Sequence, residues 1–413
     1  MAQLPPATPS ERSPSEAPAR ERGSALEVLL AFLRLGLTSF GGPVAHLGYF
    51  RTEFVERRRW LDDRGYSDLV ALCQFLPGPA SSQVGMALGL SRAGWAGALM
   101  AWLGFTLPSA IALIAFAYGI GRWGDLAASG AVQGLKVAAV AVVAQAVWGM
   151  ARSLCPDRPR AGLAILAALL TLALPSAIGQ VGAIVASGLI GWWLVRVPHQ
   201  EPAAHPGYRV SRGAAVAALT LLLLLLLGLP LFATATGSAL WALVDGFYRA
   251  GALVFGGGHV VLPLLQATVV PSGAVSNADF LAGYGAAQAV PGPLFTFAAY
   301  LGALADSPLR GWAGGLVFLV VIFMPAFLLL VAALPFWDEL RQRDAVQSAM
   351  AGVNAGVVGI LLSALYDPVW TSAIHGRTEF GIALAAFGLL VYARVSPVFV
   401  VALSAAAGWA LLG

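Results

Sequence analysis

The sequence predicts an all-α polytopic membrane protein made of two homologous repeats, which we expect to be inverted relative to each other. Its 413 residues are 59% hydrophobic and only 11% charged, whereas a soluble protein carries about 25% charged residues. Apolar runs of about 20 residues recur almost end to end, which is typical of a chain that crosses a membrane many times. Motifs of the first half also recur in the second half. In total the sequence indicates about 13 hydrophobic segments, some of them broken.

The composition argues against several other classes of protein. Lys plus Arg number 24 and Asp plus Glu number 20, an excess too small to predict nucleic-acid binding. The two cysteines, Cys73 and Cys155, form no spacing motif, so we expect neither a disulfide framework nor a metal site, and no cofactor. The sequence has no His-Glu-x-x-His or Gly-x-Ser-x-Gly motif, which disfavours an intramembrane enzyme.

The first repeat is expected over residues 24–195. Residues 1–23 are rich in Pro, Ser, Glu and Arg and predict a disordered, cytoplasmic tail without the apolar region of a signal peptide. Apolar segments follow at about 24–50, 66–90, 93–120, 130–151, 161–175 and 177–195. A polar loop and a linking transmembrane helix with a run of seven leucines are expected over 196–236. The second repeat then covers residues 237–413.

Recurring motifs support the duplication. Phe40-Gly41-Gly42 recurs as Phe255-Gly256-Gly257, and Gln74-Phe75-Leu76-Pro77-Gly78-Pro79 recurs as Gln288-Ala289-Val290-Pro291-Gly292-Pro293. The separation stays between 214 residues (Gln74 to Gln288) and 218 residues (Gly134 to Gly352). Chance does not keep such a register, so we infer an internal duplication. Interrupted helices at equivalent places predict a transporter site between the repeats.

The number of segments sets the expected orientation of the repeats. Each repeat has six segments and one linking segment lies between the repeats, so equivalent segments are seven apart. Because seven is odd, we expect the repeats to be inverted. This fails if an odd number of segments per repeat re-enter the membrane without crossing it. The positive-inside rule places the N-terminus in the cytoplasm and the C-terminus outside. The loop from Arg51 to Arg64 carries five arginines and contradicts this alternation, which favours a preceding segment that turns back.

The first Pro-Gly-Pro break is the centre of the first repeat. Proline lacks a backbone N–H and fixes φ, so Pro77 and Pro79 end one helix and begin another, with Gly78 giving backbone freedom between them. If Pro79 lies in the first helical turn, the free N–H groups of Ala80 to Gln83 point at one spot, with the hydroxyls of Ser81 and Ser82 close by. This is the form of a helix N-terminus that binds an anion. The alternative is a kink or a re-entrant turn without a ligand.

The second Pro-Gly-Pro break, at Pro291-Gly292-Pro293, offers fewer hydrogen-bond donors. Ser81-Ser82-Gln83 corresponds there to Phe295-Thr296-Phe297. If the site is asymmetric, the first copy binds the anion and the second, including Thr296, mainly shapes its path. Gln74 and Gln288 precede the two breaks and offer amides to an oxygen ligand.

Three basic residues lie inside apolar segments, where charges are costly and indicate function. Arg34 follows Glu27 by seven residues and Arg249 follows Asp245 by four, so a structural ion pair is the alternative for both. Lys136 has no acid nearby in the sequence and corresponds to Asn354. Its ammonium either snorkels to the interface or faces an anion.

The glycine-rich breaks differ between the copies. The first is Gly41-Gly42-Pro43 and the second is Gly256-Gly257-Gly258-His259. They allow close backbone approach either to a ligand or to another helix, the latter being common in membranes. His46 and His259 are not equivalent in the repeat, and each is either a proton site or a polar packing residue.

At these residues the sequence resembles the chromate ion transporter family in its long, two-domain form. The matching pieces are Ser39-Phe40-Gly41-Gly42-Pro43, Trp60-Leu61-Asp62-Asp63, Phe75-Leu76-Pro77-Gly78-Pro79, Ser82-Gln83-Val84-Gly85-Met86-Ala87, Phe255-Gly256-Gly257-Gly258-His259 and Gln288-Ala289-Val290-Pro291-Gly292-Pro293. The resemblance covers nearly the whole chain after residue 24. It implies export of chromate from the cytoplasm, chromate resistance, sulfate as a related anion, and a location in a bacterial inner membrane.

The residues alone support a transporter for a small oxyanion, and a carrier for sulfate or another oxyanion is the alternative. A divalent anion that leaves a negative interior gains about 4.6 kcal/mol per 100 mV, so the membrane potential is a sufficient drive, with anion exchange as another route. The expected partners are chromate, sulfate and the lipid bilayer, and the oligomeric state stays open, a homodimer included.

Overall fold

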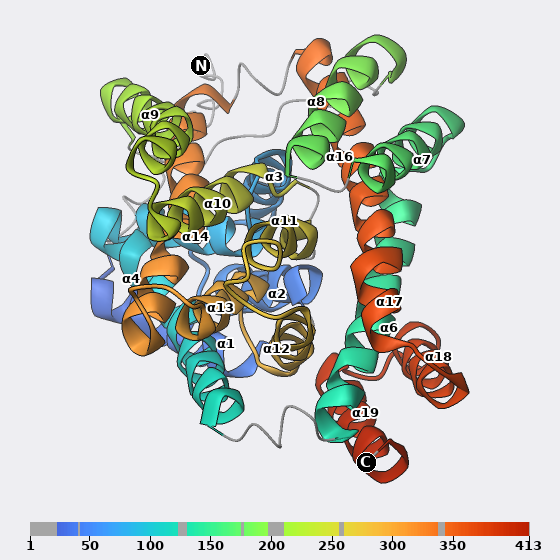
Figure 1. Ribbon diagram of the computed structural model, residues 1–413. Coiled ribbons are helices and arrows are strands. Elements are labelled where there is room, and N and C mark those ends of the chain that lie inside the picture. Colours follow the sequence, from blue (N-terminus) through green and yellow to red (C-terminus); the bar gives the residue numbers. More distant parts are fainter. Residues whose placement is uncertain are drawn as a thin grey trace, which may run out of the picture.

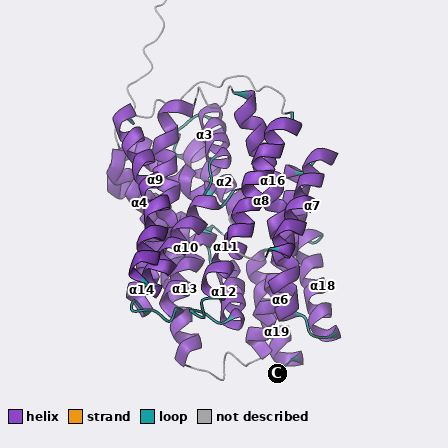
Figure 2. Ribbon diagram, turned by 45° about the horizontal axis from the view of Figure 1, so that its top comes forward, coloured by secondary structure: helices purple, strands orange, loops and turns teal. Residues whose placement is uncertain are grey.

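The computed structural model describes residues 23–39, 42–122, 130–174, 177–196, 210–255, 260–337 and 343–412. Within these ranges the chain is helical and contains no β-strand (Figure 2), which confirms the all-α prediction for this part of the chain. The predicted N-terminal tail lies outside the described residues except for Gly23, and most of the polar loop before the linking helix also lies outside them.

The first repeat begins with short helices and continues with longer ones. Its elements are α1 (Ala25–Thr38), α2 (Gly42–Arg51), the π-helix η1 (Thr52–Arg57), α3 (Asp63–Phe75), α4 (Ala80–Arg122), α6 (Gly130–Leu154), α7 (Arg158–Ala173) and α8 (Ala177–Leu194). The dihedral angles of Ala93 and Gly94 are not helical, so α4 consists of a short first part and a long second part. The linking helix α9 (Arg212–Thr236) follows.

The second repeat has the same order of elements. It contains α10 (Ala239–Leu253), α11 (Val261–Val269), α12 (Asn277–Ala289), the 3₁₀ turn η3 (Leu294–Thr296), α13 (Phe297–Leu304), α14 (Gly311–Ala333), η4 (Leu334–Phe336), α16 (Asp344–Ala364), η5 (Leu365–Trp370), α17 (Thr371–Ala373), α18 (Arg377–Val391) and α19 (Pro397–Leu411). Even the caps correspond: Asp62 accepts the N–H of Gly65 at the start of α3, and Ser276 accepts the N–H of Asp279 at the start of α12.

The described helices differ in whether they can cross a membrane. Five are long and apolar enough, and they lie at 80–120, 130–154, 212–236, 311–336 and 344–367. Three shorter apolar helices lie at 179–194, 294–304 and 397–411. The predicted count of about 13 segments is therefore not confirmed as a count of spans.

The short helices at the start of the first repeat turn back in pairs. At 1.5 Å per residue, the 14 residues of α1 and the 10 of α2 reach about 21 and 15 Å, less than the roughly 30 Å of a hydrocarbon core. Glu27 at the start of α1 lies 3.2 Å from Arg92 and 3.8 Å from Arg58. The chain therefore returns to the same place at residues 27, 58 and 92. The segments expected at 24–50 and 66–90 are thus two hairpins, with tips near Gly42 and at the first Pro-Gly-Pro.

The second repeat contains a hairpin of the same kind. The N–H of Asp306, after α13, donates to the carbonyl of Ala274, before α12, at 3.0 Å. Helices α12 and α13 therefore form a hairpin whose tip is the second Pro-Gly-Pro.

The longer helices of the two repeats pack in reciprocal pairs. A Cβ at Gly134 of α6 would meet the Ser404 carbonyl of α19, and a Cβ at Gly352 of α16 would meet the Ser187 carbonyl of α8. These are equivalent contacts, so a two-fold relation holds between the repeats. In Figure 1, α6 runs upward towards α7 while α16 runs downward towards α17, and these helices with α8, α18 and α19 form one body beside the other helices.

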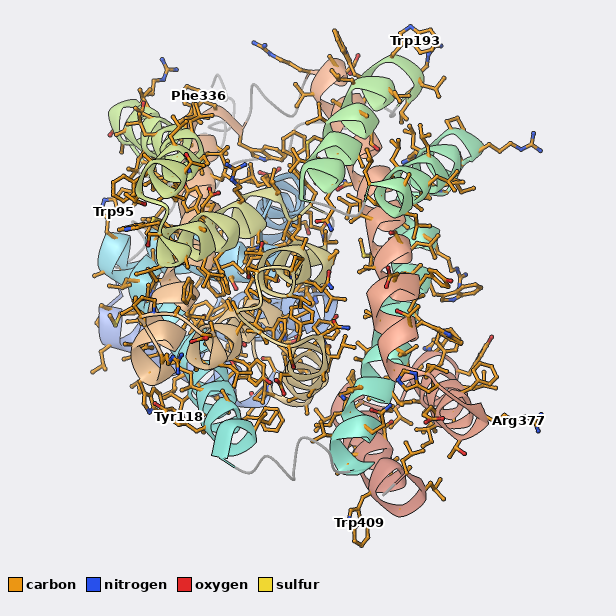
Figure 3. All side chains as sticks on the ribbon, viewed as in Figure 1. Trp95, Tyr118, Trp193, Phe336, Arg377 and Trp409 are labelled. Atoms are coloured by element: carbon orange, nitrogen blue, oxygen red, sulfur yellow. The ribbon has the colours of Figure 1, made fainter. Side chains whose placement is uncertain are left out.

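Exposed tryptophans mark the two ends of this body. Trp193 at the end of α8 is 85% exposed, and Trp409 at the end of α19 is 71% exposed. Figure 3 shows the two side chains at opposite ends of the molecule. The equivalent residues Trp193 and Trp409 therefore lie at opposite ends of the molecule.

Candidate functional site

Each Pro-Gly-Pro break is hydrogen-bonded to a residue that precedes the glycine-rich break of the other repeat. The N–H of Gly78 donates to the carbonyl of Val254, which follows α10, at 2.6 Å. The N–H of Gly292 donates to the carbonyl of Ser39, which follows α1, at 3.0 Å. Gly78 is equivalent to Gly292 and Val254 to Ser39, so these are the same bond made twice. Both Pro-Gly-Pro turns therefore lie against the ends of α1 and α10, the helices that lead into the glycine-rich breaks.

The local sequence explains why the backbone bends there. Gly78 has φ +120° and Gly292 has φ +98°, a region that L side chains rarely adopt. A Cβ at Gly78 would lie 2.8 Å from the Cβ of Ala326, and a Cβ at Gly292 would lie 3.0 Å from the Phe105 carbonyl oxygen. Close approach to the opposite repeat, as well as the turn, requires glycine at both positions.

The first copy presents buried polar groups at the start of α4. Ser81, Ser82 and Gln83 are each at most 3% exposed. The N–H of Gln83 already donates to the Pro79 carbonyl, so only the N–H groups of the preceding residues match the predicted free helix start, which corrects the inclusion of Gln83. The Gln83 amide donates to the carbonyls of Pro77 and Ala326 at 3.0 and 3.2 Å, and holds the turn against α14.

Two oxygen atoms of this helix start have no partner within the described structure. The Ser82 hydroxyl and the Gln83 Oε1 atom are buried without a hydrogen bond. The Ser81 hydroxyl lies 3.4 Å from Nδ1 of His46 on α2. Buried polar groups of native proteins are nearly always paired, so this helix start has hydrogen-bonding capacity that the described residues leave unused.

The second copy has a different character. The Thr296 hydroxyl donates to the Pro293 carbonyl at 2.8 Å and is thereby satisfied. Phe295 packs on Phe323, and Phe297 packs among Phe280, Tyr284 and Tyr300. The first copy therefore has a polar helix start and the second copy has an aromatic one, which is the difference in composition that the sequence predicted.

A small polar pocket lies beside the second break. It has a volume of about 50 Å³, and its lining includes Gly42, Pro43, Gln145, Gln288 and Gly292. The Gln288 amide nitrogen is buried without a hydrogen bond in the described structure. Since one water needs about 10–15 Å³ of such volume, the pocket admits a few waters or a small anion. It brings together the first glycine break and the second Pro-Gly-Pro.

Among the described residues, no hydrogen bond or ion pair joins the basic candidates to this centre. Arg34 is on an exposed face of α1, and Glu27 pairs with Arg58 and Arg92. Arg249 pairs with Asp245 at 2.8 Å. Lys136 is half-buried and interacts electrostatically with Asp279 of α12, an acid that is distant in the sequence.

The other predicted residues divide into three groups. Gln74 is exposed near the end of α3 and is not brought to the pocket. Pro77, Pro79, Pro291 and Pro293 flank the turns as expected. The remaining candidates lie outside the described residues: Gly41, Gly256, Gly257 and His259.

The structure places at the centre two residues that sequence reasoning did not assign to substrate binding. His46 is 1% exposed and lies near both Ser81 and the Ser39 backbone. Ser39 is fully buried, and its hydroxyl has no partner in the described structure. The available signal was their position beside the glycine break, because a polar residue there sits near the tip of a hairpin.

Comparisons with known proteins agree with this architecture. The family model described as Chromate transporter matches residues 26–192 and again residues 241–409. A "Chromate transport protein" of Pseudomonas aeruginosa is 29% identical over 93% of this chain and 91% of its own length. A "Probable chromate transport protein" of Synechococcus elongatus is 28% identical, with 86% and 87% coverage. A "Chromate transport protein" of Cupriavidus metallidurans is 26% identical, with 94% and 92% coverage.

No solved structure matches the chain. The family model, in contrast, covers more than half of it in two separate regions, one in each repeat. The chain is therefore a multi-pass transporter that belongs to the chromate transporter family.

Proposed function

We propose that this protein exports chromate from the cytoplasm across a bacterial inner membrane and so confers chromate resistance. The observation that carries the proposal is the pair of reciprocal bonds from Gly78 to Val254 and from Gly292 to Ser39. It brings each Pro-Gly-Pro turn against the helix end that precedes the glycine-rich break of the other repeat. Transporters built from such repeats bind their substrates at the junction of the repeats. The names of the relatives supply chromate as the substrate.

The oxyanion binds at the start of α4. Burial of an anion is costly unless it is hydrogen-bonded, and a helix N-terminus supplies backbone donors and a favourable dipole. The Ser82 hydroxyl adds a donor and the Ser81 hydroxyl lines the same site beside His46. The pocket at Gly42, Gln288 and Gly292 lies on the proposed path. Lys136, Arg34 and Arg249 act at longer range by raising the positive potential along the route.

The two repeats, at 24–195 and 237–413, are inverted in the membrane. Five of the described helices have the length of a span; adding the shorter α7, α8, α18 and α19 gives nine crossings. The hairpins enter and return on one side. Five crossings then separate α1 from α10, and this odd number turns the second repeat over. The C-terminus lies outside, opposite the cytoplasmic N-terminus.

The membrane potential drives export. A divalent anion that moves out of a negative interior gains about 4.6 kcal/mol per 100 mV, or roughly three decades of concentration. Purified protein in liposomes, with the potential clamped by potassium and valinomycin, tests this. Labelled chromate flux should change several-fold with the potential.

The alternative is a carrier for sulfate or an exchanger of the two anions. Labelled sulfate in the same vesicles separates these functions. A flux that ignores the potential and requires sulfate on the far side would establish exchange in place of potential-driven export. Protein that carries sulfate and not chromate would overturn the substrate assignment.

A further inference from the structure

His46 is the buried side chain in this centre whose chemistry the proposed function leaves unused. It lies on α2, one turn after the glycine break, and is 1% exposed. Its ring stands perpendicular to Phe105 with centroids 5.2 Å apart. Its Nδ1 atom lies 3.4 Å from the Ser81 hydroxyl, and its Nε2 atom is buried without a hydrogen bond among the described residues.

The two ring nitrogens therefore have different surroundings. In a neutral imidazole one nitrogen carries the proton and the other accepts a hydrogen bond. When the proton is on Nε2, Nδ1 accepts from the Ser81 hydroxyl and Nε2–H is left as an unused donor. A hydroxyl can donate or accept, so the contact with Ser81 permits this tautomer without selecting it.

The unused donor has suitable neighbours. Ser81 and Ser82 form the start of α4, and the Ser82 hydroxyl is also buried without a partner in the described structure. The Ser39 backbone lies near the imidazole, and the Ser39 hydroxyl is likewise unpartnered there. Buried unpaired groups are rare in native proteins. Their concentration at one helix start indicates that a ligand completes them.

We propose that His46 is a binding residue for the transported oxyanion, in the tautomer whose Nε2–H donates a hydrogen bond to an anion oxygen and whose Nδ1 accepts from the Ser81 hydroxyl. The inference rests on the proposed site at the start of α4. Here the anion is recognised by neutral donors, because in the described structure no hydrogen bond or ion pair joins Arg34, Lys136 or Arg249 to this cluster.

A set of amide substitutions separates the roles of the two nitrogens. The amide nitrogen of Gln reaches the position of Nε2, whereas that of Asn reaches the position of Nδ1. His46→Gln should keep the KM for chromate within about threefold of the parent. His46→Asn and His46→Leu should raise KM at least tenfold. His375→Asn is the matched control, because His375 is exposed between α17 and α18, and its KM should equal that of the parent.

A second measurement does not require transport. Chromate should raise the Tm of the parent and of His46→Gln in detergent, and leave the Tm of His46→Asn unchanged, since only a state that binds the ligand is stabilised by it. Equal KM values and equal Tm shifts for Gln and Asn would overturn the inference. If the Gln variant fails to fold, the Asn variant decides the question. A parental KM in His46→Asn would overturn the role of Nε2. A raised KM, together with a parental Tm in the absence of chromate, would support it.

The outcome is distinct from that of the proposed function. If the parent transports chromate and every His46 variant keeps the parental KM, the binding role of His46 is excluded and the proposed function stands. A parent that carries only sulfate overturns chromate as the substrate, and the same variants measured with sulfate still decide the role of His46.

Discussion

At the scale of single residues, the candidate site depends on which side chains the hairpins bury together. Ser81 and Ser82 were predicted because they directly follow a helix break. Arg34 was also predicted to lie on the path, but the structure leaves it on an exposed face. Helical spacing predicts which residues share a face, whereas the neighbour that covers that face is set by packing between distant segments. The sequence left two interpretations of His46, and only the structure showed that it lies beside Ser81.

Replacement of both serines at the helix start tests the binding site. Ser81→Ala with Ser82→Ala should raise the KM for chromate about tenfold, equivalent to about 1.4 kcal/mol, because the Ser82 donor to a charged ligand and the Ser81 partner of His46 are both lost. Transport kinetics in proteoliposomes measure this, at membrane expression equal to the parent. Thr296→Val in the second copy is the control, and it should alter the maximal rate more than KM. An unchanged KM in the double variant would exclude the serines from binding.

Removal of Lys136 tests the long-range role of charge. Lys136→Gln should lower cellular resistance to chromate at normal protein levels, because the positive potential on the path falls. Asp279→Asn is the informative companion, since Asp279 interacts electrostatically with Lys136 and its neutralisation leaves the ammonium in place. Full protection by Lys136→Gln would show that the ammonium serves structure or snorkels.

At the scale of elements, the hairpin tips are held by glycines that have no substitute. Gly78→Ala and Gly292→Ala should each abolish transport and lower the free energy of unfolding by about 1–3 kcal/mol, because φ is positive and the opposite repeat leaves no room. In contrast, a Cβ at Gly149 of α6 would meet nothing within 4 Å beyond its own stretch of helix, so Gly149→Ala should be neutral or slightly stabilising. Thermal unfolding in detergent and chromate flux measure both effects. Normal flux in the Gly78 variant would contradict the tight packing of the turn.

An ionic cluster closes the base of the first two hairpins. Partial burial of Glu53 favours its protonated form, but hydrogen bonds and charges from Arg58 and Arg57 outweigh burial and lower the pKa of its carboxyl group. Arg58 also approaches Glu27, which pairs with Arg92. The charges of both hairpins are thereby joined at one place.

The lowered pKa gives this cluster a definite pH dependence. The stabilisation is present above the ordinary carboxyl pKa of about 4 and is lost as the pH falls through the lower pKa of the folded state. Glu53→Gln should cost about 1–2 kcal/mol at neutral pH and should remove part of the acid sensitivity. Tm measured from pH 7 to pH 3 tests this. Parallel curves for parent and variant would exclude Glu53 from acid unfolding.

At the scale of the whole molecule, the duplication was predictable and the number of spans was not. The register of Gly and Pro motifs survives because backbone turns and close approach need those residue types at fixed positions. Apolar runs, in contrast, look alike whether they cross the membrane or turn back inside it. The ion pairs from Glu27 to Arg58 and Arg92 show the return of the chain, and they form between residues too far apart in sequence for any local pattern to predict.

The inverted arrangement is tested with single cysteines. Asp62 and Ser276 are equivalent, exposed caps, so Asp62→Cys and Ser276→Cys should react with an impermeant thiol reagent from opposite sides of the membrane. Cys73 is fully buried. Burial raises the pKa of Cys155 to about 11, so its thiol reacts slowly with the reagent. Both variants are made in a protein that also carries Cys155→Ser, which removes this reaction. Labelling of both positions from one side would exclude inversion.

The reciprocal packing of the repeats also has a consequence for biogenesis. Gly134 of α6 rests on Ser404 of α19, a residue that the ribosome adds 270 positions later. At a synthesis rate of about 5–20 residues per second, α6 waits roughly 15–50 s for its partner. Throughout that interval its glycine-lined face meets lipid or the insertion machinery. The first repeat therefore enters the membrane as an unfinished half, and the interior closes only after the last helix has left the ribosome.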